Sequence, residues 1–182
     1  MTDKKEAIRI AKVFLNKKEG YQNYRVDDAN ILERDSLWYI PFKQRIPKSN
    51  EVSVGAYNGI IVDKNSSDFL QPGSALPLEE WMYGFEIGIR GKRYDLIIEK
   101  VSDLQKALDV LSSMGLTYID IEVEHGIEWK IPKNFTRKEI QKRLNKLPCT
   151  FKNQTFSYEI GKFKTIRNER IFEYKLEITT QS

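Results

Sequence analysis

The period of the hydrophobic pattern changes repeatedly along this chain, and this change limits the folds that it can adopt. Apolar residues within 4–19 recur at helical spacing, whereas those within 117–124 and 170–179 alternate with polar residues. The first spacing is typical of an amphipathic helix, and strict alternation is typical of a strand with one buried face. The sequence therefore predicts an α+β fold.

The first half of the chain has the pattern of a helix, an antiparallel sheet and a second helix. Its expected elements are a helix over 4–19 that Asp3 caps, extended runs at 24–34, 37–45 and 60–62, and a helix that begins at Pro77. Pro41 interrupts the second extended run. Because proline cannot donate a backbone hydrogen bond, we expect an edge strand or a bulge there.

The second half restarts the pattern and predicts a second α/β unit with a mixed or antiparallel sheet. Its expected elements are a strand at 96–98, a helix that Ser102 caps and Gly115 ends, strands at 117–124 and 127–131 that form a hairpin through His125 and Gly126, a helix from Thr136 to before Pro148, and strands at 155–160 and 170–179. The stretch from Gly88 to Lys92 is too short for a flexible linker. We therefore expect two adjoining units, residues 1–91 and 92–182.

The composition indicates a protein that remains in the cytoplasm. Hydrophobic residues make up 40% and charged residues 31% of the chain, which is ordinary for a globular protein. The N-terminal residues have scattered charges and no apolar signal-peptide core, and no later stretch approaches about 20 uncharged apolar residues. The single cysteine, Cys149, cannot form an intrachain disulfide, as is usual in a reducing compartment.

Two segments of the first half carry a family resemblance. They are Gly55-Ala56-Tyr57-Asn58-Gly59-Ile60-Ile61-Val62-Asp63-Lys64 and Gly73-Ser74-Ala75-Leu76-Pro77-Leu78-Glu79-Glu80-Trp81. Over about residues 1–90 the chain resembles the immunity protein 35 (YrhB-like) family, including the preceding helix and the aromatic strand around Trp38. One position departs from the family, which often has a proline where this chain has Gly59.

The resemblance implies a function in binding. Members of that family are small α+β proteins, many of them encoded beside polymorphic toxins, and they are taken to neutralise the cognate toxin by binding it. The resemblance therefore implies a toxin-immunity protein without cofactors, in which Gly55, Gly59, Gly73, Pro77 and Trp81 build the scaffold. The glycines suit turns with positive φ or close backbone approach. The resemblance does not extend to residues 92–182.

Two sets of reactive residues could form a catalytic site. Asp120 with Glu128 and Lys130 resembles the carboxylates and lysine of a Mg²⁺-dependent nuclease, although Glu-x-Lys is common by chance in so charged a chain. Cys149 and His125 have no local motif of a nucleophile and its base. We therefore expect no enzymatic activity, with the nuclease as the second alternative to toxin immunity. The main alternative is an interaction or chaperone-like module that has no toxin partner.

The helix near residue 140 is the strongest candidate for a partner surface. With Ile140, Leu144 and Leu147 toward the core, Lys138, Lys142 and Lys146 recur at every fourth position on the opposite face, and Arg137 and Arg143 flank them. Like charges at this spacing destabilise a helix slightly. The alternatives are a solvated face, pairing with Asp120, Glu122 and Glu124, an acidic protein partner, or nucleic acid. Nucleic acid is disfavoured because few aromatic residues lie between the basic ones.

Two tyrosines complete the candidate interface. Tyr57 lies in a glycine-flanked loop, and Tyr83 points away from the apolar face expected for the second helix. Exposed aromatic and arginine side chains are the usual hot spots of protein interfaces. The oligomeric state stays open at this level.

Overall fold

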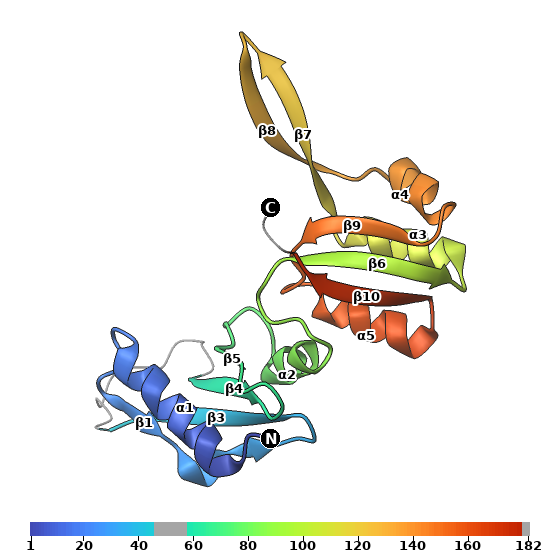
Figure 1. The fold of residues 1–182 in the computed structure, drawn as a ribbon. Helices are drawn as coiled ribbons and strands as arrows, with labels where there is room; N and C mark the ends of the chain where they lie inside the picture. The colour runs from blue at the N-terminus through green and yellow to red at the C-terminus, as the bar shows by residue number, and fades with distance from the viewer. Residues whose placement is uncertain (46–57, 180–182) are drawn as a thin grey trace. The chain divides into compact units, whose positions relative to one another are not determined.

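The computed structural model describes residues 1–45 and 58–179. They form two compact units, Met1–Arg90 and Gly91–Ser182, so the division falls one residue before the expected boundary. Five helices and antiparallel sheets make up the described residues, which confirms the α+β fold class (Figure 1). Within these residues, no helix combines the length and apolarity that crossing a membrane requires.

Unit 1 contains a helix packed on an antiparallel sheet. Its elements are α1 (Lys4–Lys17), β1 (Tyr24–Val26), the 3-10 turn η1 (Asp28–Asn30), β2 (Leu32–Glu33), β3 (Leu37–Gln44), β4 (Gly59–Asp63), β5 (Phe69–Leu70) and α2 (Leu78–Glu86). The strand order is β1-β3-β4-β5, and β2 also pairs with β3. Asp3 caps α1 as expected, because its carboxylate accepts the Glu6 N–H at 2.8 Å.

One core cluster of unit 1 lies between α1 and one face of this sheet, and the residues on its other face, such as Leu37 and Ile61, are buried as well. Helical spacing brings Ala7, Ala11 and Leu15 of α1 to the sheet. Alternation along β3 and β4 supplies the facing side chains, which are Trp38, Ile40, Phe42, Ile60 and Val62. Each buried side chain of this size contributes about 1.5–3 kcal/mol relative to an exposed one. The two amphipathic patterns therefore explain why this helix and this sheet pack together.

Pro41 lies in a central strand, so the expectation of an edge position is wrong. Its strand β3 pairs with β4 on one side and with β1 and β2 on the other. The neighbouring Phe42 N–H donates to the Asn58 carbonyl at 2.6 Å, so the Pro41 nitrogen points to the opposite side. On that side, β1 pairs with β3 up to Phe42 and β2 pairs with it from Tyr39. Pro41 lies between these two paired stretches, so no ladder hydrogen bond requires its missing N–H.

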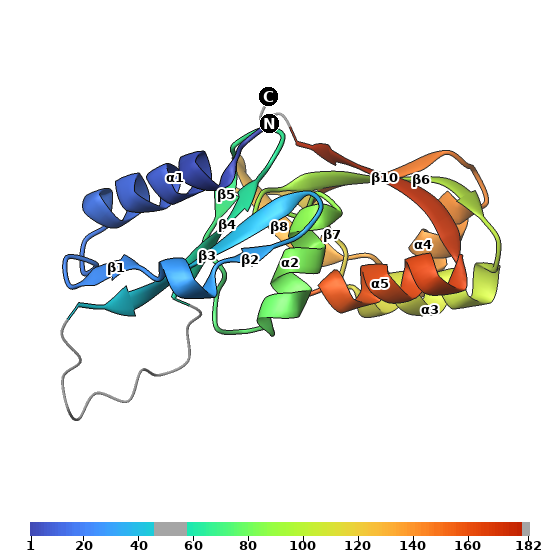
Figure 2. The same ribbon diagram turned by 90° about the horizontal axis from the view of Figure 1, so that it is seen from below.

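Unit 2 contains a three-stranded sheet, three helices and a separate hairpin. Its elements are β6 (Tyr94–Val101), α3 (Leu104–Ser113), β7 (Thr117–Glu124), β8 (Ile127–Asn134), α4 (Arg137–Leu144), β9 (Cys149–Gln154), α5 (Ile160–Glu169) and β10 (Phe172–Ile178). The sheet is antiparallel in the order β10-β6-β9, and β7 pairs with β8 alone. Figure 2 shows α3 and α5 on the same side of this sheet.

Three features of unit 2 differ from those that the sequence predicts. The strand expected at 155–160 is β9, which ends at Gln154, and the helix α5 was not expected at all. The N-cap of α3 is Asp103, whose carboxylate accepts the Lys106 N–H at 3.0 Å, and not Ser102. An aspartate caps a helix as well as a serine does, so sequence alone left the two neighbours nearly equivalent.

Candidate functional site

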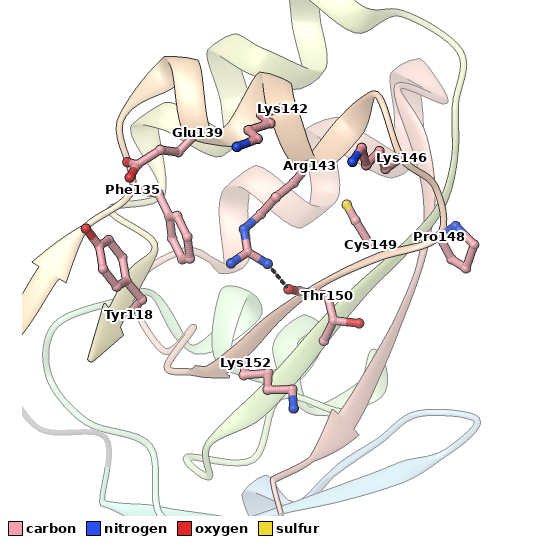
Figure 3. Close-up of a pocket in the computed structure, with 10 residues that line it drawn as sticks. All are labelled: Tyr118, Phe135, Glu139, Lys142, Arg143, Lys146, Pro148, Cys149, Thr150 and Lys152. Carbon is pink, nitrogen blue, oxygen red and sulfur yellow. Dashed lines mark hydrogen bonds between the residues drawn. The ribbon is translucent and has the colours of Figure 1, made fainter. Parts of the chain in front are cut away.

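A pocket of about 610 Å³ lies beside α4 and β9 in unit 2. Figure 3 shows the side chains that line it, which are Tyr118, Phe135, Glu139, Lys142, Arg143, Lys146, Pro148, Cys149, Thr150 and Lys152. Four of these residues are cationic and one is anionic. The pocket therefore combines a basic rim with aromatic rings.

The start of α4 fixes the direction of the basic side chains. Thr136 and Glu139 form the expected capping box, in which each residue bonds the backbone N–H of the other. These Thr136 N–H and hydroxyl donors hold the pKa of Glu139 below its ordinary value. Ile140 and Leu144 are buried beneath the helix. The Glu139 carboxylate is thus already engaged in capping the N-terminus of α4.

Arg143 is exposed, and its guanidinium contacts two rings and a carbonyl. Its guanidinium lies 4.7 Å from the centroid of Phe135 and 5.6 Å from that of Phe151. One N–H donates to the Thr150 carbonyl at 2.9 Å (Figure 3). Phe135 packs edge-on against Phe151 at 5.3 Å. Because a guanidinium has five N–H donors and one of them bonds the Thr150 carbonyl, Arg143 retains donors for a ligand.

Three lysines surround this arginine without an ionic partner. Lys142 lies on α4, Lys146 follows the helix and Lys152 lies on β9. Within residues 1–45 and 58–179, none of the three forms an ion pair or a side-chain hydrogen bond. The site therefore has an excess of positive charge that the described residues do not neutralise.

The structure divides the cationic face that the sequence predicted. Lys142, Arg143 and Lys146 line the pocket, but Lys138 does not. Arg137 forms an ion pair with Asp109 of α3 at 2.7 Å. Lys152 was not predicted as a site residue, because the strand was expected at 155–160 and not at Cys149–Gln154.

The alternative of internal pairing with the acidic strand is not observed. Asp120 and Glu122 of β7 pair with Lys133 of β8 at 2.6 and 2.8 Å. These hydrogen bonds lower the pKa of Asp120 and raise that of Lys133. Asp120 and Glu122 thus share one lysine of their own hairpin, and among the described residues they do not pair with the lysines of the pocket.

Two residues near the end of α4 differ in their environments. Leu147 was expected in the core and is 38% exposed, since α4 ends at Leu144 and the chain turns before Pro148. Cys149 is buried in β9, and desolvation raises the pKa of its thiol. His125 lies at the hairpin turn, well away from β9 (Figure 1). The structure therefore does not bring the cysteine and the histidine together.

The residues of the nuclease alternative do not converge. In the β7–β8 register, Ile121 is opposite Lys130 and Val123 is opposite Glu128. Opposed residues share a face and neighbours alternate, so Asp120 lies on the other face of the hairpin from Glu128 and Lys130. Within the described residues, no group of three or more His, Cys, Asp or Glu side chains could hold a metal ion.

The candidate residues of unit 1 have largely internal contacts. Gly55 and Tyr57 lie outside the described residues. Tyr83 is half-buried, so less of its ring is at the surface than we expected. Trp81 donates its indole N–H to the Gly73 carbonyl at 3.0 Å, and Pro77 precedes α2 as its N-cap. Gly73 does not have the expected positive φ or close backbone approach.

Gly59 has a close contact that explains its presence. It belongs to β4 opposite Pro41. A Cβ atom at this position would lie 2.7 Å from both the Ile40 carbonyl oxygen and the Tyr39 ring. The expectation of close approach holds at Gly59, in a strand and not in a turn.

The β7–β8 hairpin exposes more apolar surface than we expected from the sequence. Both strands carry large apolar residues that are at least half exposed, namely Ile119, Ile121, Val123, Ile127 and Trp129. The two-residue turn was the available signal, because it fixes the register of the strands. In that register the apolar residues of β7 and those of β8 lie on opposite faces. One core cannot cover both faces.

Comparison with known proteins gives no match to a family model, to a characterised protein or to a solved structure.

Proposed function

We propose that this chain is a cytoplasmic immunity protein that binds a cognate toxin in a stoichiometric complex and thereby inhibits it. The resemblance of about residues 1–90 to the immunity protein 35 family supports this proposal. The observation that carries it is the pocket beside α4, in which lysines without an ion-pair partner among the described residues lie around Arg143. Such a site suits the binding of a protein surface better than it suits catalysis.

The charges of the pocket define the side chain that it accepts. Lys142, Lys146 and Lys152 lie near Arg143, and the one carboxylate at the rim is held by the end of α4. An aspartate or glutamate side chain of the partner would relieve the repulsion between these cations. It would also form charge-assisted hydrogen bonds with the free donors of Arg143, which are stronger than neutral ones. The proposed ligand is therefore an acidic segment of the toxin.

The contacts of Arg143 make it the expected hot spot. The Thr150 carbonyl and the two rings restrict its guanidinium, and a restricted side chain loses less conformational entropy on binding. Arginine with neighbouring aromatic rings is the composition typical of interface hot spots. The surrounding lysines would mainly raise the rate of encounter.

The first experiment tests inhibition directly. The protein encoded beside this gene would be expressed with and without this chain, and growth and the mass of the purified complex would be measured. Toxicity that this chain suppresses, together with a complex of fixed stoichiometry, is the expected result. Toxicity that persists although both proteins are folded contradicts the proposal. Binding without any toxicity favours the alternative of an interaction or chaperone-like module.

The second experiment locates the interface with two charge-matched variants. In one variant, glutamate replaces Lys142, Lys146 and Lys152. In the control it replaces three exposed lysines outside the pocket, Lys92, Lys138 and Lys164. Association with the toxin at low salt should slow by roughly 10- to 100-fold in the pocket variant and by only a few-fold in the control. Equal rates for the two variants would remove the pocket from the interface.

A further inference from the structure

The β7–β8 hairpin forms a two-stranded sheet that extends from the rest of unit 2 (Figure 1). Its strands pair along eight residues each, and the turn residues His125 and Gly126 have φ values of 51° and 79°. Positive φ at both central residues defines the turn type that matches the twist of a hairpin. The arm is therefore regular, and within the described residues of unit 2 the outer edge of β8 pairs with no other strand.

The backbone groups at the free edge of β8 follow from this turn. The Ile127 N–H points toward β7, because the last residue of such a turn donates to the first. Directions alternate along a strand, so the N–H and C=O groups of Glu128 and Lys130 point away from β7. At the base of the hairpin, the Gln154 side chain bonds both the N–H and the C=O of Thr117 from outside, at 2.9 and 2.7 Å, as the same alternation requires.

The charges at this edge favour one self-pairing register. If two copies of β8 lie antiparallel about a two-fold axis at Trp129, Glu128 of each copy lies opposite Lys130 of the other. If the two-fold axis moves by one residue, to position 128 or to position 130, Glu128 lies opposite Glu128 or Lys130 lies opposite Lys130. Opposite charges directly across a sheet stabilise it and like charges destabilise it. The two side chains are exposed, and neither has an ion-pair partner among the described residues.

On the opposite face, the β8 residues of the same register are apolar, with Asp120, Glu122 and Glu124 of β7 beside them. Trp129 would lie against its own copy on the axis, and Ile127 of each copy would lie opposite Ile131 of the other. Trp129 is 52% and Ile127 is 57% exposed. Pro132 follows Ile131 and has no N–H, so pairing would end where the facing chain enters its turn.

The free edge of β7 does not offer an equivalent surface for pairing with its own copy. Its side chains on one face include Asp120, Glu122 and Glu124. Self-pairing of β7 in any register centred on this stretch places one carboxylate opposite or next to another. Charge therefore distinguishes the two edges of the hairpin.

We propose that the chain forms a two-fold dimer through β8, in which two hairpins join into one four-stranded antiparallel sheet. The pairing of Ile127–Ile131 supplies four backbone hydrogen bonds, two Glu128–Lys130 contacts and an apolar stripe around Trp129. This seam is smaller than the ~800 Å² per partner of a standard interface, so we expect a Kd on the order of 10–100 µM. The dimer does not depend on the proposed toxin.

Sedimentation equilibrium of the full chain tests the charge pairing. Glu128→Lys and Lys130→Glu should each weaken dimerisation by roughly tenfold or more, since each single change creates two like-charge contacts. The double variant restores opposite charges and should return to within about threefold of the original affinity. The control Glu124→Lys makes the same charge change on β7 and should leave the affinity nearly unchanged.

Cross-linking tests the register. In a Cys149→Ser background, Trp129→Cys should form a disulfide with its own copy, because a non-hydrogen-bonded pair places the Cα atoms about 4.5 Å apart. Ile127→Cys should link poorly to itself but readily to Ile131→Cys when the two variants are mixed. A chain that stays monomeric at several hundred micromolar, a double variant without restoration, or equal self-linking at positions 127 and 129 would each overturn the proposal.

Discussion

Replacing Gly59 with alanine should destabilise unit 1 because the strand β4 has no room for a Cβ atom. The added carbon would lie 2.7 Å from the Ile40 carbonyl oxygen and from the Tyr39 ring. Contacts between such atoms are optimal at about 3.5–4.0 Å. The two strands would have to separate by roughly 1 Å at a position where Ile40 and Ile60 are fully buried.

The expected cost follows from two opposing effects. Overpacking of a well-packed core costs about 1–3 kcal/mol, and a clash with backbone belongs at the upper end of this range. Alanine recovers about 0.5–1 kcal/mol of the conformational entropy that glycine loses in a strand. The net loss should therefore be about 2 kcal/mol. With a urea slope of about 1–3 kcal/mol per molar, the denaturation midpoint should fall by roughly 1 M.

Tryptophan fluorescence in urea measures this change in unit 1 alone. Trp38 and Trp81 belong to unit 1 and are buried, so a Trp129→Phe background removes the signal of unit 2. Gly73→Ala is the matched control, since a Cβ there would meet the Trp81 ring at an ordinary 3.6 Å. The control should change the free energy of unfolding by less than about 0.5 kcal/mol. Equal midpoints for the two variants would refute the argument from close approach.

Two further predictions concern carboxylates. Burial raises the pKa of Asp63, but backbone N–H groups of the following turn and the Arg90 guanidinium outweigh it, so the pKa lies below its ordinary value. This stabilisation is complete above the unfolded pKa of about 3.9 and is lost as the pH falls through the folded pKa. The Asp63→Asn variant should therefore lose less stability between pH 7 and pH 3 than the original chain does. Equal losses for the two proteins in urea titrations would contradict this. The purified chain should not cleave DNA or RNA with Mg²⁺ or Mn²⁺, because Asp120 lies on the opposite hairpin face from Glu128; cleavage that Asp120→Ala and Glu128→Ala both abolish would refute this.

The helices that the sequence predicted well are those with clear end signals. Asp3 caps α1, and Thr136 with Glu139 begins α4, as their spacing indicates. Helix α5 lacks such signals. Its N-cap is Glu159 without a side-chain cap bond, and it ends at Arg170 in a left-handed conformation that glycine usually adopts. Its amphipathic face is buried against the sheet, so tertiary packing determines this helix more than its ends do.

The candidate site was predictable in its charge but not in its geometry. The sequence places Lys142, Arg143 and Lys146 near one another, because they are close along the chain. It does not indicate that Phe135 and Phe151 lie beside the guanidinium of Arg143, since that contact requires β9 to lie next to α4. Long-range packing therefore distinguishes Arg143, which contacts rings and a carbonyl, from the lysines around it.

The two proposed surfaces of unit 2 differ in the interaction that would dominate each of them. The pocket draws its lining from residue 118 and from residues 135–152. The dimer seam uses Ile127–Ile131, so no residue is shared. Charge dominates the pocket, where it governs the rate of encounter and is weakened by salt. Backbone hydrogen bonds and apolar side chains dominate the seam, where they govern dissociation and resist salt. Dimerisation and partner binding should therefore respond differently to ionic strength, and a loss of one does not require a loss of the other.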